Sequence, residues 1–83
     1  MGDVIVVFRV MPEDMNNLES IRSELEKLKP QKIEEEPIAF GLKAFRFIKL
    51  ISEKEGELDK MEGKLSKIKG VQSVEVVELS RSL

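Results

Sequence analysis

Residues 36–42 read Glu-Pro-Ile-Ala-Phe-Gly-Leu and lie midway along an 83-residue chain, between two halves of similar pattern. Pro37 and Gly41 are typical turn residues, so this segment predicts a hairpin turn. The three residues between them are apolar, whereas turns that face water are normally polar. The turn therefore either folds back beneath the domain or offers an apolar side chain to a partner.

The half before the turn predicts a strand followed by a helix. Residues 4–11 are apolar except for Arg9, which indicates a central strand buried on both faces. The following helix has Asn16 or Asn17 as its expected N-cap and Pro30 as its stop. Four apolar residues share one face of this helix: Leu18, Ile21, Leu25 and Leu28.

Residues 31–36 predict an edge strand, because they include three consecutive acids and are followed at once by Pro37. Neighbouring side chains on a strand point to opposite faces, so Glu34, Glu35 and Glu36 cannot converge on one cation. We interpret the three acids as a solvated sheet edge; the alternative is a site for Mg²⁺ or Ca²⁺.

The half after the turn repeats the order strand, helix, strand. Residues 42–51 predict a second central strand, on which Phe45 and Phe47 share one face. The second helix is expected to stop at Gly70, and residues 71–79 predict a more polar edge strand. Its apolar stripe has the spacing of the first one: Leu58, Met61, Leu65 and Ile68.

Two βαβ halves of matched design predict a ferredoxin-like βαββαβ sandwich of the α+β class. In this arrangement two helices cover one face of a four-stranded antiparallel sheet, and the other face stays open. A chain of this length is expected to form one domain, residues 1–83. The two helical stripes are then core, and the open face or the turn is available to a partner.

The composition excludes several kinds of active site. The chain has no cysteine and no histidine, which rules out disulfides, thiolate metal sites and catalysis by a histidine base. A net charge of −2 implies no general attraction to nucleic acid. We find no signal peptide and no apolar run long enough to cross a bilayer. We therefore expect a cytoplasmic protein-interaction domain that is not an enzyme and needs no cofactor.

Two alternatives share the same fold. An RNA-binding or ribosome-associated module would need aromatic rings on the open sheet face, and Phe8, Phe45 and Phe47 are the candidates. A gel shift with tRNA or rRNA fragments would identify that function. A small-molecule regulatory domain that dimerises through its sheet is the other alternative, and light scattering would give its mass.

Residues 35–42 closely resemble the turn of the archaeal elongation factor 1-beta family. The likeness covers essentially the whole chain, including residues 1–4, 10–12, 33–36 and 70–74. The resemblance implies the ferredoxin-like fold. It also implies an activity: promoting exchange of GDP for GTP on elongation factor 1-alpha, the GTPase that delivers aminoacyl-tRNA to the ribosome.

The resemblance also implies which residues bind the partner. In eukaryotic relatives an aromatic residue in this turn docks into a pocket of the GTPase, and Phe40 stands at the matching position. The resemblance therefore favours a turn that exposes its apolar side chain to a partner over a turn that is buried beneath the domain. The neighbours expected to share this contact are Pro37, Ile38, Ala39 and Gly41.

A second contact is implied at the C-terminus. The eukaryotic relatives have a lysine next to last, which reaches toward the magnesium and phosphate region of the GTPase. Ser82 stands at the matching position here, so the chain departs from that pattern. Arg81 is the nearest cation, and the expected contact consists of Arg81, Ser82 and Leu83.

Overall fold

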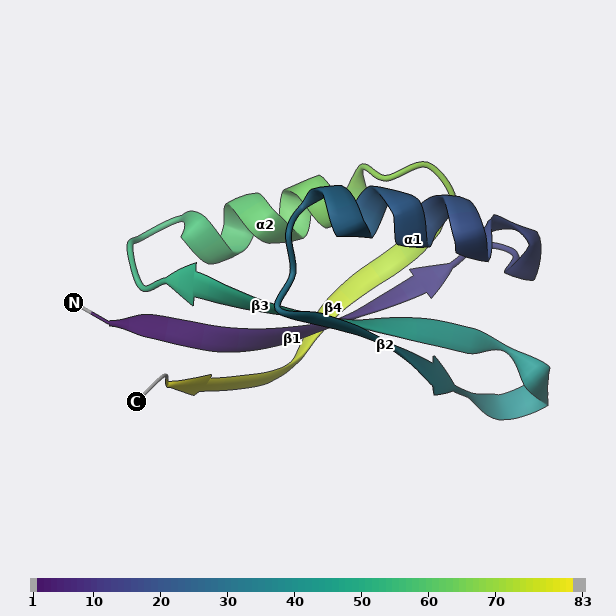
Figure 1. The fold of residues 1–83 in the computed structure, drawn as a ribbon, viewed down its shortest axis with the longest axis horizontal. Helices are drawn as coiled ribbons and strands as arrows, with labels where there is room; N and C mark the ends of the chain where they lie inside the picture. Colours follow the sequence, from purple (N-terminus) through teal and green to yellow (C-terminus); the bar gives the residue numbers. More distant parts are fainter. Residues whose placement is uncertain (1, 82–83) are drawn as a thin grey trace.

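The computed structural model describes residues 2–81, which form a ferredoxin-like α+β sandwich (Figure 1). Its elements are β1 (Asp3–Pro12), η1 (Met15–Asn17), α1 (Leu18–Lys27), β2 (Lys32–Pro37), η2 (Ala39–Gly41), β3 (Lys43–Ser52), α2 (Glu57–Ser66) and β4 (Val71–Arg81). The four strands pair antiparallel in the order β2-β3-β1-β4. The two apolar strands are thus central and the two more polar ones lie at the edges, which confirms the predicted arrangement.

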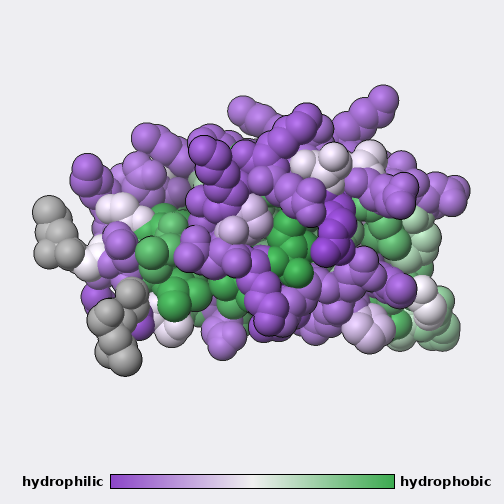
Figure 2. All heavy atoms as spheres, in the orientation of Figure 1, coloured by the Kyte–Doolittle hydropathy of each residue, from purple (hydrophilic) through white to green (hydrophobic). Residues whose placement is uncertain are grey.

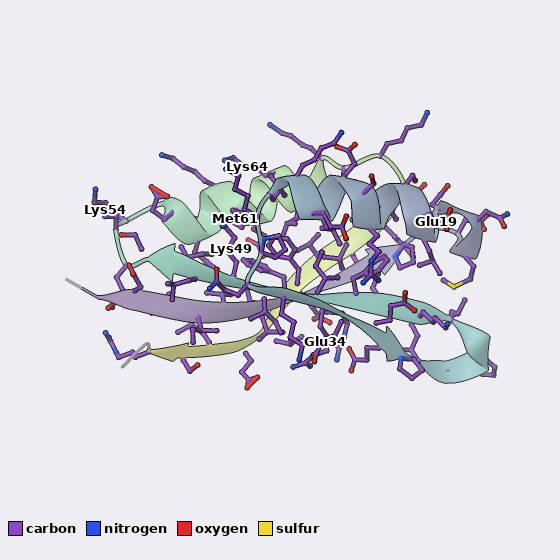
Figure 3. All side chains as sticks on the ribbon, in the orientation of Figure 1. Glu19, Glu34, Lys49, Lys54, Met61 and Lys64 are labelled. Atoms are coloured by element: carbon purple, nitrogen blue, oxygen red, sulfur yellow. The ribbon has the colours of Figure 1, made fainter. Side chains whose placement is uncertain are left out.

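Both helices cover one face of the sheet (Figure 1). Ile21 and Leu25 of α1 and Leu65 of α2 are fully buried. The other members of the two predicted stripes are partly buried against the same core: Leu18, Leu28, Leu58, Met61 and Ile68. Figure 3 shows Met61 between α2 and the sheet. The helical stripes are therefore core, as predicted.

The three phenylalanines of the central strands lie beneath the helices. Phe8 and Phe47 face each other in register, with ring centroids 6.1 Å apart and ring planes at 58°. Phe45 joins them in the buried core. The expectation that these rings could stand on the open face for RNA to stack on was wrong. Charged Arg9 and Arg46 take the open face of these strands, and the strand alternation turns the three rings the other way.

The first helix starts at the predicted position, but its capping hydrogen bond differs from the prediction. Neither Asn16 nor Asn17 caps it with a side chain; instead, the carboxylate of Asp14 accepts a hydrogen bond from the Asn16 backbone N–H at 2.9 Å. A short 3-10 turn then leads into α1 at Leu18. Asn17 therefore takes the predicted N-cap position of α1, while the side-chain capping bond belongs to the 3-10 turn before it.

An irregularity in β4 decides which side its last residues take. Val7 pairs with Glu78 and Phe8 with Val76, which leaves Val77 as the extra residue of a β-bulge. The bulge shifts the alternation of the strand by one residue. Arg81 consequently pairs with Val4, a residue of the core, and lies on the helix side of the sheet.

The molecule is elongated, with principal extents of 41 × 21 × 17 Å. The β2–β3 turn lies at one end of the long axis, and both chain ends lie at the other (Figure 1). The strand register agrees, because Arg81 pairs near the start of β1 whereas the turn lies beyond the end of β1. No helix within residues 2–81 is long and apolar enough to cross a membrane.

Candidate partner-binding site

The turn between β2 and β3 closes through two backbone hydrogen bonds. The Ile38 N–H donates to the Leu42 carbonyl at 2.8 Å, and the Leu42 N–H donates to the Ala39 carbonyl at 3.3 Å. Between them Ala39–Gly41 forms a single 3-10 turn with Phe40 at its centre. These two bonds close the turn, and no residue of this 3-10 turn is buried, so its backbone is accessible to water.

Phe40 holds an aromatic ring almost entirely in water. It is 97 % exposed, and Leu42 beside it is 42 % exposed. Figure 2 shows apolar residues gathered at this end of a largely hydrophilic surface. Exposing a phenylalanine forgoes about 1.5–3 kcal/mol of transfer free energy that burial would supply. A displayed ring of this kind is typical of a binding anchor.

The backbone at Phe40 is strained as well. Its φ of 63° and ψ of 31° lie in the left-handed region, which costs a non-glycine residue roughly 1–2 kcal/mol. The next residue, Gly41, also has a positive φ, 74°, but glycine adopts it without penalty. Strain combined with exposure at one side chain is typical of functional turns, where the surrounding structure holds the unfavourable conformation.

The predicted site residues fall into two separate groups. Pro37, Ile38, Ala39, Phe40 and Gly41 come together at the turn. Arg81 lies at the opposite end, paired with Val4 near the start of β1, and its guanidinium Nη1 is 2.6 Å from the Oε1 of Glu53. Ser82 and Leu83 lie outside the described residues. The structure therefore assembles the turn and places the terminal arginine far from it.

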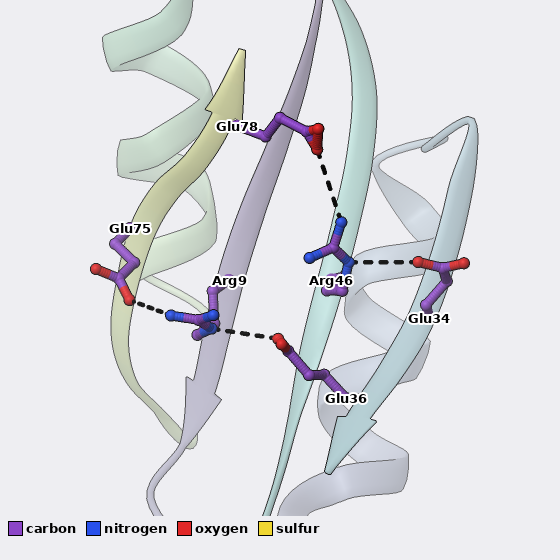
Figure 4. A network of polar contacts seen from close by, with 6 residues as sticks. All are labelled: Arg9, Glu34, Glu36, Arg46, Glu75 and Glu78. Carbon is purple, nitrogen blue, oxygen red and sulfur yellow. Dashed lines mark hydrogen bonds and ion pairs between the residues drawn. The ribbon is translucent and has the colours of Figure 1, made fainter. Parts of the chain in front are cut away.

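The open face of the sheet carries a network of ion pairs centred on two arginines (Figure 4). Arg9 of β1 contacts two acids, and Arg46 of β3, its cross-strand neighbour, contacts two others. The four distances are Arg9–Glu36 3.2 Å, Arg9–Glu75 2.9 Å, Arg46–Glu34 3.4 Å and Arg46–Glu78 3.9 Å. The network spans all four strands, and Figure 3 shows Glu34 on the side opposite the helices.

The three consecutive acids of β2 point to alternate faces, as predicted. Glu34 and Glu36 join the open-face network, whereas Glu35 lies on the helix side. There the Glu35 carboxylate is 3.1 Å from Arg22 of α1 and 3.6 Å from Lys43. Each acid thus has a basic partner, so the edge is more ordered than a solvated row of charges. Across residues 2–81 no three acidic side chains gather as a metal site would require.

These contacts shift two ionisation equilibria. A hydrogen bond from Lys32, with its positive charge, lowers the pKa of Glu34 below the ordinary 4.5, and Arg46 adds to the effect. Hydrogen bonds to Glu36 and Glu75 raise the pKa of Arg9 above its ordinary value. Both shifts mean that the charged forms are favoured in the folded state.

The Glu34 shift predicts a pH dependence of stability. Because its pKa is lower folded than unfolded, its contribution is fully present above the unfolded pKa of 4.5 and is lost as pH falls through the folded pKa. We expect Glu34→Gln to reduce the loss of melting temperature between pH 6 and pH 3, followed by circular dichroism. Glu55→Gln, in an exposed loop, is the control. Equal acid sensitivity of Glu34→Gln and wild type would contradict the prediction.

A surface depression lies away from the turn. It has a volume of about 830 Å³ and runs between the two helices. Leu28 and Ile68 contribute apolar surface, while Lys27, Lys64 and Lys67 line its rim. Lysines near helix C-termini complement the helix dipole, which explains their presence without a ligand. The candidate site is therefore a protruding tip rather than a cavity.

Sequence reasoning missed the basic partners at the base of the turn. Arg9 lies 27 residues before Glu36, so the chain offers no local spacing that pairs them. Leu42 was assigned to a strand, yet it is exposed beside Phe40. An isolated arginine in an apolar strand is the one signal that pointed to a counter-charge nearby.

Comparison with known proteins shows that the chain is similar to members of one family. Residues 5–81 match the family described as the EF-1 guanine nucleotide exchange domain. Elongation factor 1-beta of Methanoregula boonei is 40 % identical over 83 residues, covering 96 % of this chain and 98 % of that protein. Elongation factor 1-beta of Methanosphaerula palustris is 41 % identical with the same coverage. That of Methanothermobacter thermautotrophicus is 39 % identical over 87 residues and covers 98 % of both.

A solved structure shares the fold without close sequence similarity. The ACT domain from the GTP pyrophosphokinase of Chlorobium tepidum superposes with a TM-score of 0.62, covering 90 % of this chain and 99 % of that chain. The sequences are 22 % identical, so this likeness concerns the fold alone.

Proposed function

Because the chain belongs to the EF-1 guanine nucleotide exchange domain family, we propose that it promotes exchange of GDP for GTP on elongation factor 1-alpha. The whole chain acts as one exchange-factor domain in the cytoplasm, where translation takes place. It makes and breaks no covalent bond. The observation that carries the proposal is the exposed, strained Phe40 at the tip of the β2–β3 turn.

The mechanism follows from thermodynamic linkage. A GTPase holds its nucleotide through contacts to the phosphates and through Mg²⁺ that bridges their oxygens. A factor that binds the nucleotide-free GTPase more tightly than the loaded form must, by reciprocity, weaken nucleotide binding by the same ratio. Phe40 supplies binding free energy by burying its ring in an apolar pocket of the partner.

The direct test is GDP release from elongation factor 1-alpha loaded with a fluorescent GDP. We expect the release rate to rise with the concentration of this protein and then to saturate. A complementary pull-down should retain the nucleotide-free GTPase more strongly than the GDP-loaded form. A release rate that stays constant, even when the two proteins form a complex, would overturn the proposal.

The C-terminal contact makes a separate prediction. Arg81 is tied to Glu53 and must leave it to reach a phosphate or magnesium site on the partner. We expect Arg81→Ala, or truncation before Ser80, to slow stimulated GDP release about 10-fold, since one hydrogen bond to a charged group is lost. Glu53→Gln, which frees Arg81, is the matched control and should retain activity. Full activity of the truncated chain would rule out this role.

A further inference from the structure

The tip that carries Phe40 receives little support from packing. Phe40 is 97 % exposed, and a Cβ placed on Gly41 would meet no atom within 4 Å. Beneath it lies β2, an edge strand that pairs only with β3. The direction in which the ring points must therefore be fixed at the base of the hairpin.

At that base, two consecutive glutamates are held on opposite faces of the sheet. On the open face, Nε of Arg9 is 3.2 Å from Oε1 of Glu36. On the helix face, Nη1 of Arg22 is 3.1 Å from Oε2 of Glu35. We call these two contacts the base ion pairs. They join the last residues before Pro37 to β1 on one side and to α1 on the other.

The Arg9 contact crosses a whole strand. In the sheet order β2-β3-β1, Arg9 has to reach over β3 to meet Glu36. Ala44 of β3 pairs with Glu36 in register, and its small side chain leaves room on the open face. A second nitrogen of Arg9, Nη1, is 2.9 Å from Oε1 of Glu75 on β4. The arginine therefore links the hairpin base to the opposite edge of the sheet (Figure 4).

We propose that the base ion pairs are positioning contacts: they hold the hairpin in one orientation, so that Phe40 is already placed for the partner's pocket. This inference rests on the proposed function, which it deepens. Both pairs remain accessible to water, with side chains 29–42 % exposed, and water-accessible ion pairs contribute little to global stability. Their effect on the orientation of the protruding hairpin is larger than their effect on global stability, because few other contacts orient the hairpin. A tip that is correctly oriented only part of the time binds with proportionally lower apparent affinity.

The test compares variants that remove the base ion pairs with variants that remove neighbouring ion pairs. The double variant Glu35→Gln/Glu36→Gln breaks both base ion pairs and preserves side-chain size. Glu34→Gln is its control on the same strand: it removes one carboxylate charge two residues before Glu36 and leaves both base ion pairs in place. Arg9→Met and Arg46→Met form a second matched pair, since these arginines are cross-strand neighbours with two acidic partners each.

The first readout does not depend on any partner. Amide hydrogen exchange at Ile38, whose N–H is bonded to the Leu42 carbonyl, reports opening of the hairpin. We expect exchange about 3- to 10-fold faster in the double variant and in Arg9→Met, because pairs worth up to about 1 kcal/mol each are lost. Both controls should match wild type. Arg9→Lys, which keeps a cation but loses the fork geometry, should recover part of the protection.

The second readout is stimulated GDP release. We expect the concentration for half-maximal stimulation to rise about 3- to 10-fold in the base variants with the maximal rate unchanged, since only the competent fraction falls. The inference is overturned if hydrogen exchange is unchanged in the double variant, or if Glu34→Gln has the same effect. If the wild-type protein does not stimulate GDP release, the proposed function is wrong. The hydrogen-exchange comparison still tests whether the base ion pairs hold the hairpin.

Discussion

Replacing Phe40 with alanine should weaken binding to nucleotide-free elongation factor 1-alpha by about 2 kcal/mol or more, roughly a 30-fold loss of affinity. The ring is almost wholly in water in the free protein, so its truncation removes no contact of the fold. The substitution is therefore expected to reduce the stability of the complex and not that of the free protein. Titration calorimetry with the nucleotide-free GTPase and the GDP-release assay should both report it.

The stability of the Phe40 variants provides an independent check. Phe40→Ala should change the free energy of unfolding by less than about 0.5 kcal/mol, as expected for an exposed surface position. Phe40→Gly should be at least as stable as Phe40→Ala, since glycine tolerates the positive φ at this position. Both should bind equally poorly.

A control at a distant apolar residue separates the ring from general hydrophobicity. Leu50→Ala removes a partly exposed apolar side chain from β3 far from the turn and should bind normally. If Phe40→Ala binds as wild type does, the ring has no part in the interface. If Leu50→Ala binds as poorly as Phe40→Ala, the turn is not the specific contact.

Replacing Phe47 with alanine should lower the free energy of unfolding by about 3–5 kcal/mol, because it leaves a cavity at the centre of the core. Phe47 is fully buried and packs against the ring of Phe8. A domain of this size has a total stability of roughly 5–15 kcal/mol, so this one change removes a large part of it. The variant should melt at a much lower temperature.

The measurement is urea unfolding followed by far-ultraviolet circular dichroism, since the chain has no tryptophan or tyrosine for fluorescence. Phe47→Leu, which refills most of the volume, should lose much less stability. A loss below about 1 kcal/mol in Phe47→Ala would contradict the packing described here. Phe40→Ala is thus expected to weaken binding and leave folding intact, whereas Phe47→Ala, seven residues along the chain, is expected to weaken folding.

The sequence was sufficient to predict the fold because its local signals agree with one another. The apolar stripe of each helix, the two apolar strands and the charged strand before Pro37 all predict the same sandwich. The orientation of Phe8 was harder to predict, because residues 4–11 are apolar on both faces and alternation alone cannot assign a side. Arg9 and Arg46 carried that information, since each marks the open face of its strand.

Two other features could not be predicted from local signals alone. The bulge at Val77 coincides with a break in alternation, since Val76 and Val77 are adjacent apolar residues between two glutamates, but such a break alone does not distinguish a bulge from a strand buried on both faces. The ion pair between Arg9 and Glu36 depends on the alignment of three strands, which the sequence does not specify. For the site, the sequence predicted the turn and its apolar tip, and the resemblance to a family favoured its exposure. The structure added the left-handed backbone at Phe40 and the ion pairs beneath it.

The placement of the turn and the last strand at opposite ends has a mechanical consequence. Four hydrogen-bonded strands resist stretching, so the distance from the base of the β2–β3 turn to the opposite end of the sheet, where Arg81 pairs with Val4, is nearly constant. Under the proposed function, a GTPase that engages both ends must hold its two receiving surfaces one sheet-length apart. The sheet then sets the distance between the two contacts. The domain binds most tightly to the partner conformation in which the two receiving surfaces are separated by that distance.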